Sequence, residues 1–208
     1  HRGRIMIYHI IKPFLLFSVI LFSCSNPLYD DSEYIVPEKS KQELKDYFIK
    51  NRFNLNPIEG IWSLGVMRTL YKNGNRVAFE SESHRMGLAV VKEGDLFRVY
   101  DVNGEPTNFI ATFKETDELG KYDYQCHFTE TKDNVSTTAT MFGDSILEYK
   151  YDAPKGIMMN YYCKSNNEDS KLVKKMIEDG SMRLQWQFIW AQYYPYDYDR
   201  EIGYLELW

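Results

Sequence analysis

Few residues in this sequence have the type and spacing that catalysis or metal binding requires. The chain contains four histidines, and two of them, His1 and His9, belong to a leader segment described below. His84 and His127 lie in separate predicted strands, and neither has a second ligand at the spacing that zinc sites use. The sequence also has no phosphate-binding loop and no paired-histidine motif. It therefore predicts no metal site and no cofactor.

Ser145 is the one serine in a setting similar to a catalytic motif. Residues 142–147, FGDSIL, resemble the nucleophile segment of Gly-Asp-Ser-Leu hydrolases, in which a histidine near the C terminus acts as the base. No histidine follows His127 in this chain. Gly143 followed by Asp144 is typical of a two-residue turn between antiparallel strands. We interpret the segment as a hairpin turn, and we do not expect the protein to be an enzyme.

A short hydrophobic segment near the N terminus is typical of an export signal. Arg2, Arg4 and Lys12 supply positive charge before it, and residues 14–22 are almost entirely apolar. These nine residues are too few to cross the hydrocarbon core of a membrane as a helix, because that takes about 20 residues. Their length and place fit the hydrophobic region of a cleaved signal peptide.

The segment ends in Leu-Phe-Ser-Cys, residues 21–24, which resembles the lipobox of bacterial lipoproteins. The resemblance implies cleavage before Cys24 and lipid attachment to that cysteine, so that the mature chain is held at a membrane. A plain signal peptide with an incidental cysteine is the alternative. We divide the chain into a lipoprotein signal peptide (1–23), a flexible tether (24–38) and a folded domain (39–208).

The charge of the chain argues against one large class of partners. The formal net charge is −5 at pH 7, and loss of residues 1–23 with their three positive charges moves it to −8. Nucleic-acid binding needs clustered Lys and Arg, so no nucleic-acid partner is expected. The 185 residues that remain suit one domain with a sizeable core.

Composition and turn spacing both favour a mainly β fold. The chain has 17 Tyr, 12 Phe and 4 Trp, and aromatic side chains favour strands. Turn signals such as those at 73–74 and 103–104 recur at intervals of roughly 8–15 residues. Apolar and polar residues alternate between them, most clearly over 122–128. We expect eight to ten antiparallel strands over 61–193, closed as an up-and-down barrel because closure removes exposed edges.

Two segments have a helical pattern instead. Over residues 39–52 apolar residues recur at spacings of three and four, and Ser40 can serve as the N-cap. Residues 168–177 have the same kind of spacing. We therefore predict one N-terminal helix packed on the barrel and a second, short helix before the last long strand.

The segment Asn-Pro-Ile-Glu-Gly-Ile-Trp, residues 56–62, stands at the start of the first predicted strand. It resembles the Gly-x-Trp opening of lipocalin-like (calycin-type) barrels and is similar to the opening of small bacterial lipoproteins. The resemblance implies that Gly60 and Trp62 close one end of the barrel and that Arg183, from the last strand, packs beneath the Trp62 ring. With the lipobox it implies an outer-membrane lipoprotein in the cell envelope of a Gram-negative bacterium, on either face.

The aromatic residues allow two functional interpretations. Inward-facing rings could line a cavity for a small hydrophobic ligand, since an eight-stranded barrel can hold one. The candidates for this cavity are Trp62, Tyr122, Tyr124, Trp186, Phe188 and Trp190. The same rings could instead fill the barrel as plain core. We expect a non-enzymatic binding module on a lipid anchor, and the alternative is a protein- or carbohydrate-binding surface formed by the aromatic residues of 193–208.

Two cysteines remain in the folded domain, Cys126 and Cys163. Cys126 shares a strand face with Tyr124, and alternation places Cys163 on one face with Met159 and Tyr161. Both thiols are therefore expected to point inward. An exported protein meets an oxidising environment, so they could form a disulfide if their Cα atoms lie within about 7 Å. Two buried free thiols are the alternative.

Overall fold

The computed structural model describes residues 38–165 and 167–193. The predicted signal peptide, Cys24, nearly all of the tether and the aromatic segment after Tyr193 lie outside these residues. The two ranges contain the whole of the predicted barrel.

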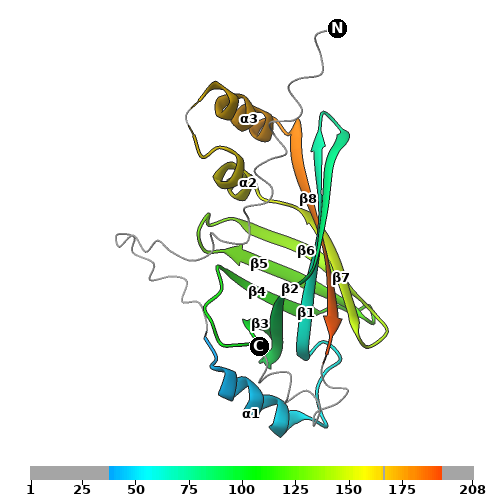
Figure 1. Ribbon diagram of the computed structural model, residues 1–208. Helices are drawn as coiled ribbons and strands as arrows, with labels where there is room; N and C mark the ends of the chain where they lie inside the picture. The colour runs from blue at the N-terminus through cyan, green and yellow to red at the C-terminus, as the bar shows by residue number, and fades with distance from the viewer. Residues whose placement is uncertain (1–37, 166, 194–208) are drawn as a thin grey trace. The chain divides into compact units, whose positions relative to one another are not determined.

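Eight antiparallel strands form a closed barrel in which each strand pairs with the next and the last pairs with the first (Figure 1). The strands are β1 (Gly60–Lys72), β2 (Asn75–Glu93), β3 (Leu96–Asp101), β4 (Phe109–Glu115), β5 (Lys121–Phe128), β6 (Asn134–Phe142), β7 (Ile146–Asp152) and β8 (Met182–Gln192). The prediction of a mainly β, up-and-down barrel is confirmed, with the lower of the two expected strand numbers.

The alternation predicted from the sequence is present over residues 122–126 of β5, but His127, expected on the solvent face, is buried. Tyr122, Tyr124 and Cys126 are buried, whereas Asp123 and Gln125 are exposed. The turn at Gly143 joins β6 to β7, and the φ angle of this glycine is +61°. A left-handed backbone at that point favours glycine, which explains the residue without any catalytic role.

The N-terminal helix α1 (Lys41–Asn51) begins at Ser40 as predicted. The Ser40 hydroxyl accepts a hydrogen bond from the Glu43 backbone N–H at 3.3 Å, and the Glu43 carboxylate accepts one from the Ser40 N–H at 2.8 Å. This reciprocal pair is a capping box. Leu44 and Phe48 pack against Ala89, Val91 and Tyr100 on the outer face of β2 and β3. The helix therefore covers the outside of the barrel.

Two further helices, α2 (Lys155–Tyr162) and α3 (Glu168–Glu178), lie between β7 and β8. The second was predicted, but the first was not, and the expectation that Met159, Tyr161 and Cys163 share a strand face is wrong. Gly156 allows α2 to approach the barrel, because a Cβ at this position would lie 2.3 Å from Asp133 Oδ2. The helix packs Met158 into an apolar cluster with α3 and β8.

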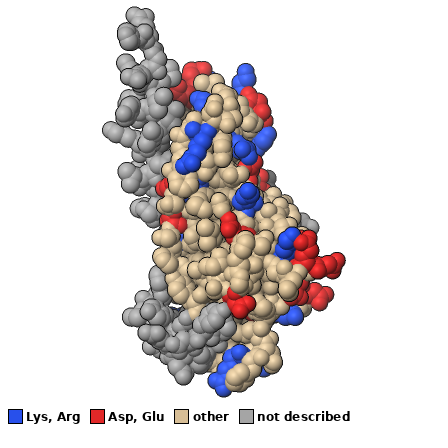
Figure 2. Space-filling model, turned by 90° about the vertical axis from the view of Figure 1, so that its right-hand side faces the viewer, with Lys and Arg blue, Asp and Glu red and all other residues tan. Residues whose placement is uncertain are grey.

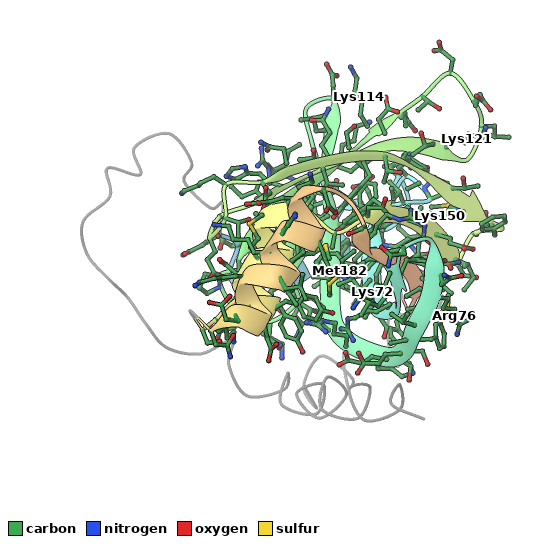
Figure 3. All side chains as sticks on the ribbon, turned by 90° about the horizontal axis from the view of Figure 1, so that it is seen from above. Lys72, Arg76, Lys114, Lys121, Lys150 and Met182 are labelled. Carbon is green, nitrogen blue, oxygen red and sulfur yellow. The ribbon has the colours of Figure 1, made fainter. Side chains whose placement is uncertain are left out.

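We call the two ends of the barrel the closed end, where β1 begins and β8 ends, and the α2 end, where β1 ends and β8 begins. Seen from above in Figure 3, α2 and α3 lie on one side of the α2 end, with Met182 beside them. Arg76, on the β1–β2 hairpin, lies on the opposite side.

Residues 56–62 build the closed end through a network of hydrogen bonds. Trp62 donates its indole N–H to the Ile58 carbonyl at 3.0 Å, and the ring is fully buried. The Gln192 amide, at the end of β8, donates to the carbonyls of Pro57 at 3.1 Å and Glu59 at 3.0 Å. The first strand and the last strand are thereby fixed to the same loop.

Glu59 is the polar centre of this network, with only 3% of its surface exposed. Its carboxylate accepts hydrogen bonds from the Tyr47 hydroxyl, from the Lys92 N–H at 3.2 Å and from the Asn56 N–H at 2.8 Å. Burial, together with the hydrogen bond to Glu59, raises the pKa of Tyr47 well above its usual range. The carboxylate connects α1, the loop and β2, so it serves three elements at once.

We predict that Glu59→Gln destabilises the fold by about 1.5–3 kcal/mol, because an amide replaces one of two accepting oxygens and brings an N–H toward donors. Urea unfolding followed by tryptophan fluorescence measures the change. Glu118→Gln is the control, since the Glu118 side chain is 70% exposed and forms a surface ion pair with Lys121. This substitution should change stability by less than about 0.5 kcal/mol. Equal effects of the two substitutions would contradict the role given to Glu59.

Candidate ligand-binding site at the α2 end of the barrel

The six aromatic residues predicted to line a cavity fall into two groups. Trp62, Tyr122, Tyr124 and Trp190 are at most 5% exposed and belong to the main core of the barrel. Trp186 and Phe188 are only partly buried and lie nearer the α2 end. The first group fills the barrel toward its closed end, so only the second group adjoins a region where a ligand could enter.

Direct ring contacts hold the buried group in place. The Tyr124 and Tyr149 rings stack with centroids 4.3 Å apart, and Trp190 donates its indole N–H to the Tyr149 hydroxyl at 3.1 Å. The Trp62 and Trp190 rings meet edge to face at 6.3 Å. Tyr122 reaches the closed end, where its hydroxyl donates to Asn56 Oδ1 at 3.2 Å. Burial and the nearby Glu115 carboxylate raise the pKa of Tyr122 to about 12.

Further aromatic side chains surround Trp186. Its ring meets Tyr151 at 5.8 Å, Phe188 at 6.0 Å and Phe128 at 6.2 Å, each edge to face. Trp186 also packs against the cluster that joins α2, α3 and the ends of β1 and β8. The inner surface of the barrel at this end is therefore aromatic and continuous with the helices that cover it.

Of the buried polar atoms that find no hydrogen-bond partner among the residues that the structure describes, two belong to side chains of the apolar cluster at this end. They are the indole Nε1 of Trp186 and the hydroxyl of Tyr162, the last residue of α2. Both side chains pack against the same apolar cluster. A buried donor without a partner costs free energy and needs an explanation, such as a bound molecule that supplies the acceptor.

A charged group lies on the inner face beside Trp186. Arg68, opposite Trp186 in the β1–β8 register, donates to Glu80 at 3.2 Å and Glu82 at 2.9 Å. Arg85 donates to Glu82 at 3.0 Å. Burial opposes the ionisation of Glu82, but the hydrogen bond from Arg68 and the charges of both arginines lower its pKa below the usual range. Two positive and two negative charges thus offset one another here.

Arg68 and Tyr162 were not among the residues singled out from the sequence. One signal was present for Arg68, because Leu64, Val66 and Leu70 mark one face of the strand and Arg68 falls on that same face. An arginine on the core face of a strand is unusual and indicates a special environment. Tyr162 gave no such signal, since the pattern of its segment predicts a strand, whereas the structure has a helix there.

Arg183 does not lie beneath Trp62 as the family resemblance implied. The β1–β8 register pairs Arg183 with Tyr71 and pairs Trp62 with Gln192, at the opposite end of both strands. The Arg183 guanidinium lies 4.7 Å from the centre of the Tyr71 ring and donates to the Asp152 carboxylate at 3.0 Å. Gly60 does open β1 at the closed end, with a φ angle of +153°.

Cys126 and Cys163 are both free thiols in the structure. Cys126 is buried inside the barrel on β5, whereas Cys163 caps the C terminus of α2 and is partly exposed. The disulfide considered from the sequence is therefore not formed, because Cys163 follows a helix and does not lie on a strand facing Cys126.

Ser145, His127 and His84 lie in different parts of the barrel. Ser145 follows the β6–β7 turn, and its carbonyl accepts from the Gln192 N–H at 2.8 Å. His127 contacts Asn134 at 2.9 Å, and His84 Nδ1 lies 2.7 Å from the Ser63 hydroxyl. No group of three His, Cys, Asp or Glu side chains suited to a metal ion occurs in residues 38–165 and 167–193.

The side of the molecule that faces the viewer in Figure 2 is mostly uncharged, and its charged side chains stand in small groups of both signs. None of the helices in the described part of the chain is both long enough and apolar enough to span a membrane. No family model, curated protein or solved structure matches the chain. The antiparallel closed barrel itself is compatible with a lipocalin-like fold.

We predict that the two thiols differ in reactivity. Burial raises the pKa of Cys126 to about 11, so almost no thiolate is present at pH 8, and the barrel wall blocks access as well. With Ellman's reagent at pH 8, Cys163 should react in the native protein and Cys126 only after unfolding, with Cys163→Ser removing the native reaction. Mass mapping that finds Cys126 labelled as fast as Cys163 would contradict the assignment.

Proposed function

We propose that this protein is a non-enzymatic binding module that holds a small hydrophobic ligand at the α2 end of its barrel. The observation that carries the proposal is the pair of partnerless polar atoms, Trp186 Nε1 and Tyr162 Oη, inside an otherwise apolar and aromatic cluster. Ligand sites are typically apolar surfaces with a few polar groups that fix orientation. This arrangement fits that description better than the tightly packed closed end does.

The ligand has an apolar body and at least one oxygen that accepts hydrogen bonds. An indole N–H can only donate, and a tyrosine hydroxyl can donate as well. Arg68 already pairs with Glu80 and Glu82, so the site holds no surplus of positive charge for an anionic group. A neutral alcohol, ester or ketone therefore suits the site better than a carboxylate does.

The element that gives way to admit the ligand is α2. It is only eight residues long, and its N-cap, Pro154, makes no side-chain hydrogen bond to the helix. The strands β1 and β8, which pack against α2, each pair with a neighbour on both sides over most of their length. Moving α2 therefore costs less than opening the barrel wall, and it exposes Trp186 and Tyr162 together.

The binding module works on a lipid anchor in this proposal. The lipobox-like residues 21–24 support attachment through Cys24, and the opening segment at 56–62 supports a lipocalin-like lipoprotein of a Gram-negative outer membrane. Lipid attachment would keep an acidic domain, which anionic lipids repel, at the membrane surface. The domain would then take up its ligand close to the membrane.

Ligand binding is tested with the full chain in detergent-free nanodiscs and three probes of equal chain length, dodecanol, dodecanoic acid and dodecane. Tryptophan quenching should saturate with dodecanol at a lower concentration than with the other two. Tyr162→Phe and Trp186→Phe should each weaken dodecanol binding about 2–10-fold, the value of one hydrogen bond. The control is Tyr161→Phe on the same helix, which should leave binding unchanged.

Two outcomes would count against the ligand proposal. One is the absence of saturable quenching by any probe, together with native mass spectra that contain no co-purified small molecule. The other is turnover of an ester that a single Ser, Asp or Glu substitution abolishes, because that result would make the protein an enzyme.

Lipid attachment is tested by the intact mass of protein extracted from membranes. The mature chain should begin at Cys24 and carry acyl groups, and Cys24→Ala should block processing or release the domain from the membrane. Ser25→Ala is the control and should be processed normally. An unmodified chain with a different first residue would remove the anchor from the proposal and leave the ligand site untouched.

A further inference from the structure

We infer that the free edge of β2 is a docking surface for a second copy of this chain, which adds its own β2 in an antiparallel arrangement. The inference does not depend on the ligand site. It comes from the pairing of the strands and from the side chains along one edge of the sheet.

β2 is the longest strand, with 19 residues. It pairs with β1 along almost its whole length, but only residues 88–93 pair with β3 on the other side. Hydrogen bonding on the β3 side of β2 ends at Gly87, whose carbonyl accepts from the Val102 N–H at 3.3 Å. From Asn75 to Met86, no strand in the described part of the chain pairs with that side of β2. Such an edge presents backbone groups that another strand can bind.

The free edge is accessible. Most side chains of residues 75–84 are exposed, and two of them are apolar, Val77 at 51% and Phe79 at 48%. The β1–β2 hairpin that carries them lies on the side of β8 away from α2 and α3 (Figures 1 and 3). Ala78, on the inner face of this stretch, packs against the cluster of α2 and α3, whereas Val77 and Phe79 are exposed.

Irregular backbone limits the length over which a partner strand can pair. The β1–β2 register shifts between Leu64 and Val66 and again between Leu70 and Tyr71. At the first shift His84 has a left-handed backbone, with a φ angle of +53°. Such bulges shorten usable edges. Between them, residues 78–82 pair with β1 without interruption, so a partner strand can pair regularly over this stretch.

Charge selects one register for two identical strands. A two-fold axis at Glu80 or at Ser81 places glutamates opposite glutamates, because both Glu80 and Glu82 lie on this stretch, and like charges directly opposite are unfavourable. A two-fold axis at Ala78 would make the partner strand pair across the second register shift, between Leu70 and Tyr71, and into the β1–β2 turn. An axis at Phe79 avoids both problems, since it sets Ala78 opposite Glu80 of the partner subunit.

The same register places the two Phe79 rings opposite each other on the outer face. Opposed aromatic residues are among the more favourable cross-strand pairs. The Arg76 guanidinium lies 4.5 Å from the centre of the Phe79 ring, so it flanks this contact. The interface is isologous, as expected for a closed dimer, and each copy covers the exposed edge of the other.

Cysteine cross-linking tests the register in the full chain in its membrane. In Phe79→Cys the two introduced thiols face each other across the axis, within the roughly 4.5–5.5 Å between Cβ atoms of opposed residues, and mild oxidation should join them. The control is Ser81→Cys on the same face, whose copies lie about 13 Å apart, four residues along the strand. Mass mapping identifies the linked peptide. Cross-linking that is absent in Phe79→Cys, or equal in Ser81→Cys, overturns the inference.

Sedimentation of the detergent-solubilised full chain supplies a second readout. The wild type should contain dimer, and Phe79→Lys should raise the dissociation constant at least about tenfold, because it removes a central aromatic residue and opposes two positive charges. Phe142→Lys is the matched control, since Phe142 is 54% exposed and ends β6, a strand that does not pair with β2. A monomeric wild type, or equal effects of the two lysines, also overturns the inference.

Discussion

The buried carboxylate of Glu59 is the contact on which the closed end of the barrel depends. A carboxyl group that is 3% exposed must find donors inside the protein, and Glu59 finds them on α1, on its own loop and on β2. Its backbone carbonyl also accepts from Gln192 at the end of β8. Four parts of the structure, α1, the loop, β2 and β8, thus meet at one residue. The indole N–H of Trp62 also bonds to this loop, at the Ile58 carbonyl.

The two ends of the barrel differ in how completely their polar groups are satisfied. At the closed end the polar atoms of Asn56, Glu59 and Trp62 have partners, and the rings above them are packed edge to face or stacked. At the α2 end Trp186 and Tyr162 keep polar atoms without partners in the described residues. In the proposed function, binding falls to the end opposite the Glu59 network, so that a movement of α2 would leave that network intact.

Much of the fold could be predicted from local patterns. Ser40 with Glu43 marks the start of α1, the alternation over β5 marks a half-buried strand, and Gly143 marks a turn. Each of these signals acts within a few residues of chain. By contrast, α2 was not predicted, because the two aromatic residues beside Cys163 are typical of a strand. The helix is stabilised by contacts that the local sequence does not reveal, namely its packing with α3 and the close approach of Gly156 to Asp133. Arg183 was misplaced for a similar reason, since the register between the first and last strands cannot be read from either strand alone.

The pairing of β1 with β8 also governs when this protein can fold. The hydrogen bond from Gln192 to Glu59 joins residues 133 positions apart, and loop closure over such a span must precede the contact that rewards it. Until the last strand arrives, β1 and β7 each expose a side that β8 will later cover. A chain delivered from its N terminus therefore cannot complete its barrel during delivery. During that interval its aromatic strands are uncovered, and unpaired strand edges of this kind are prone to aggregate.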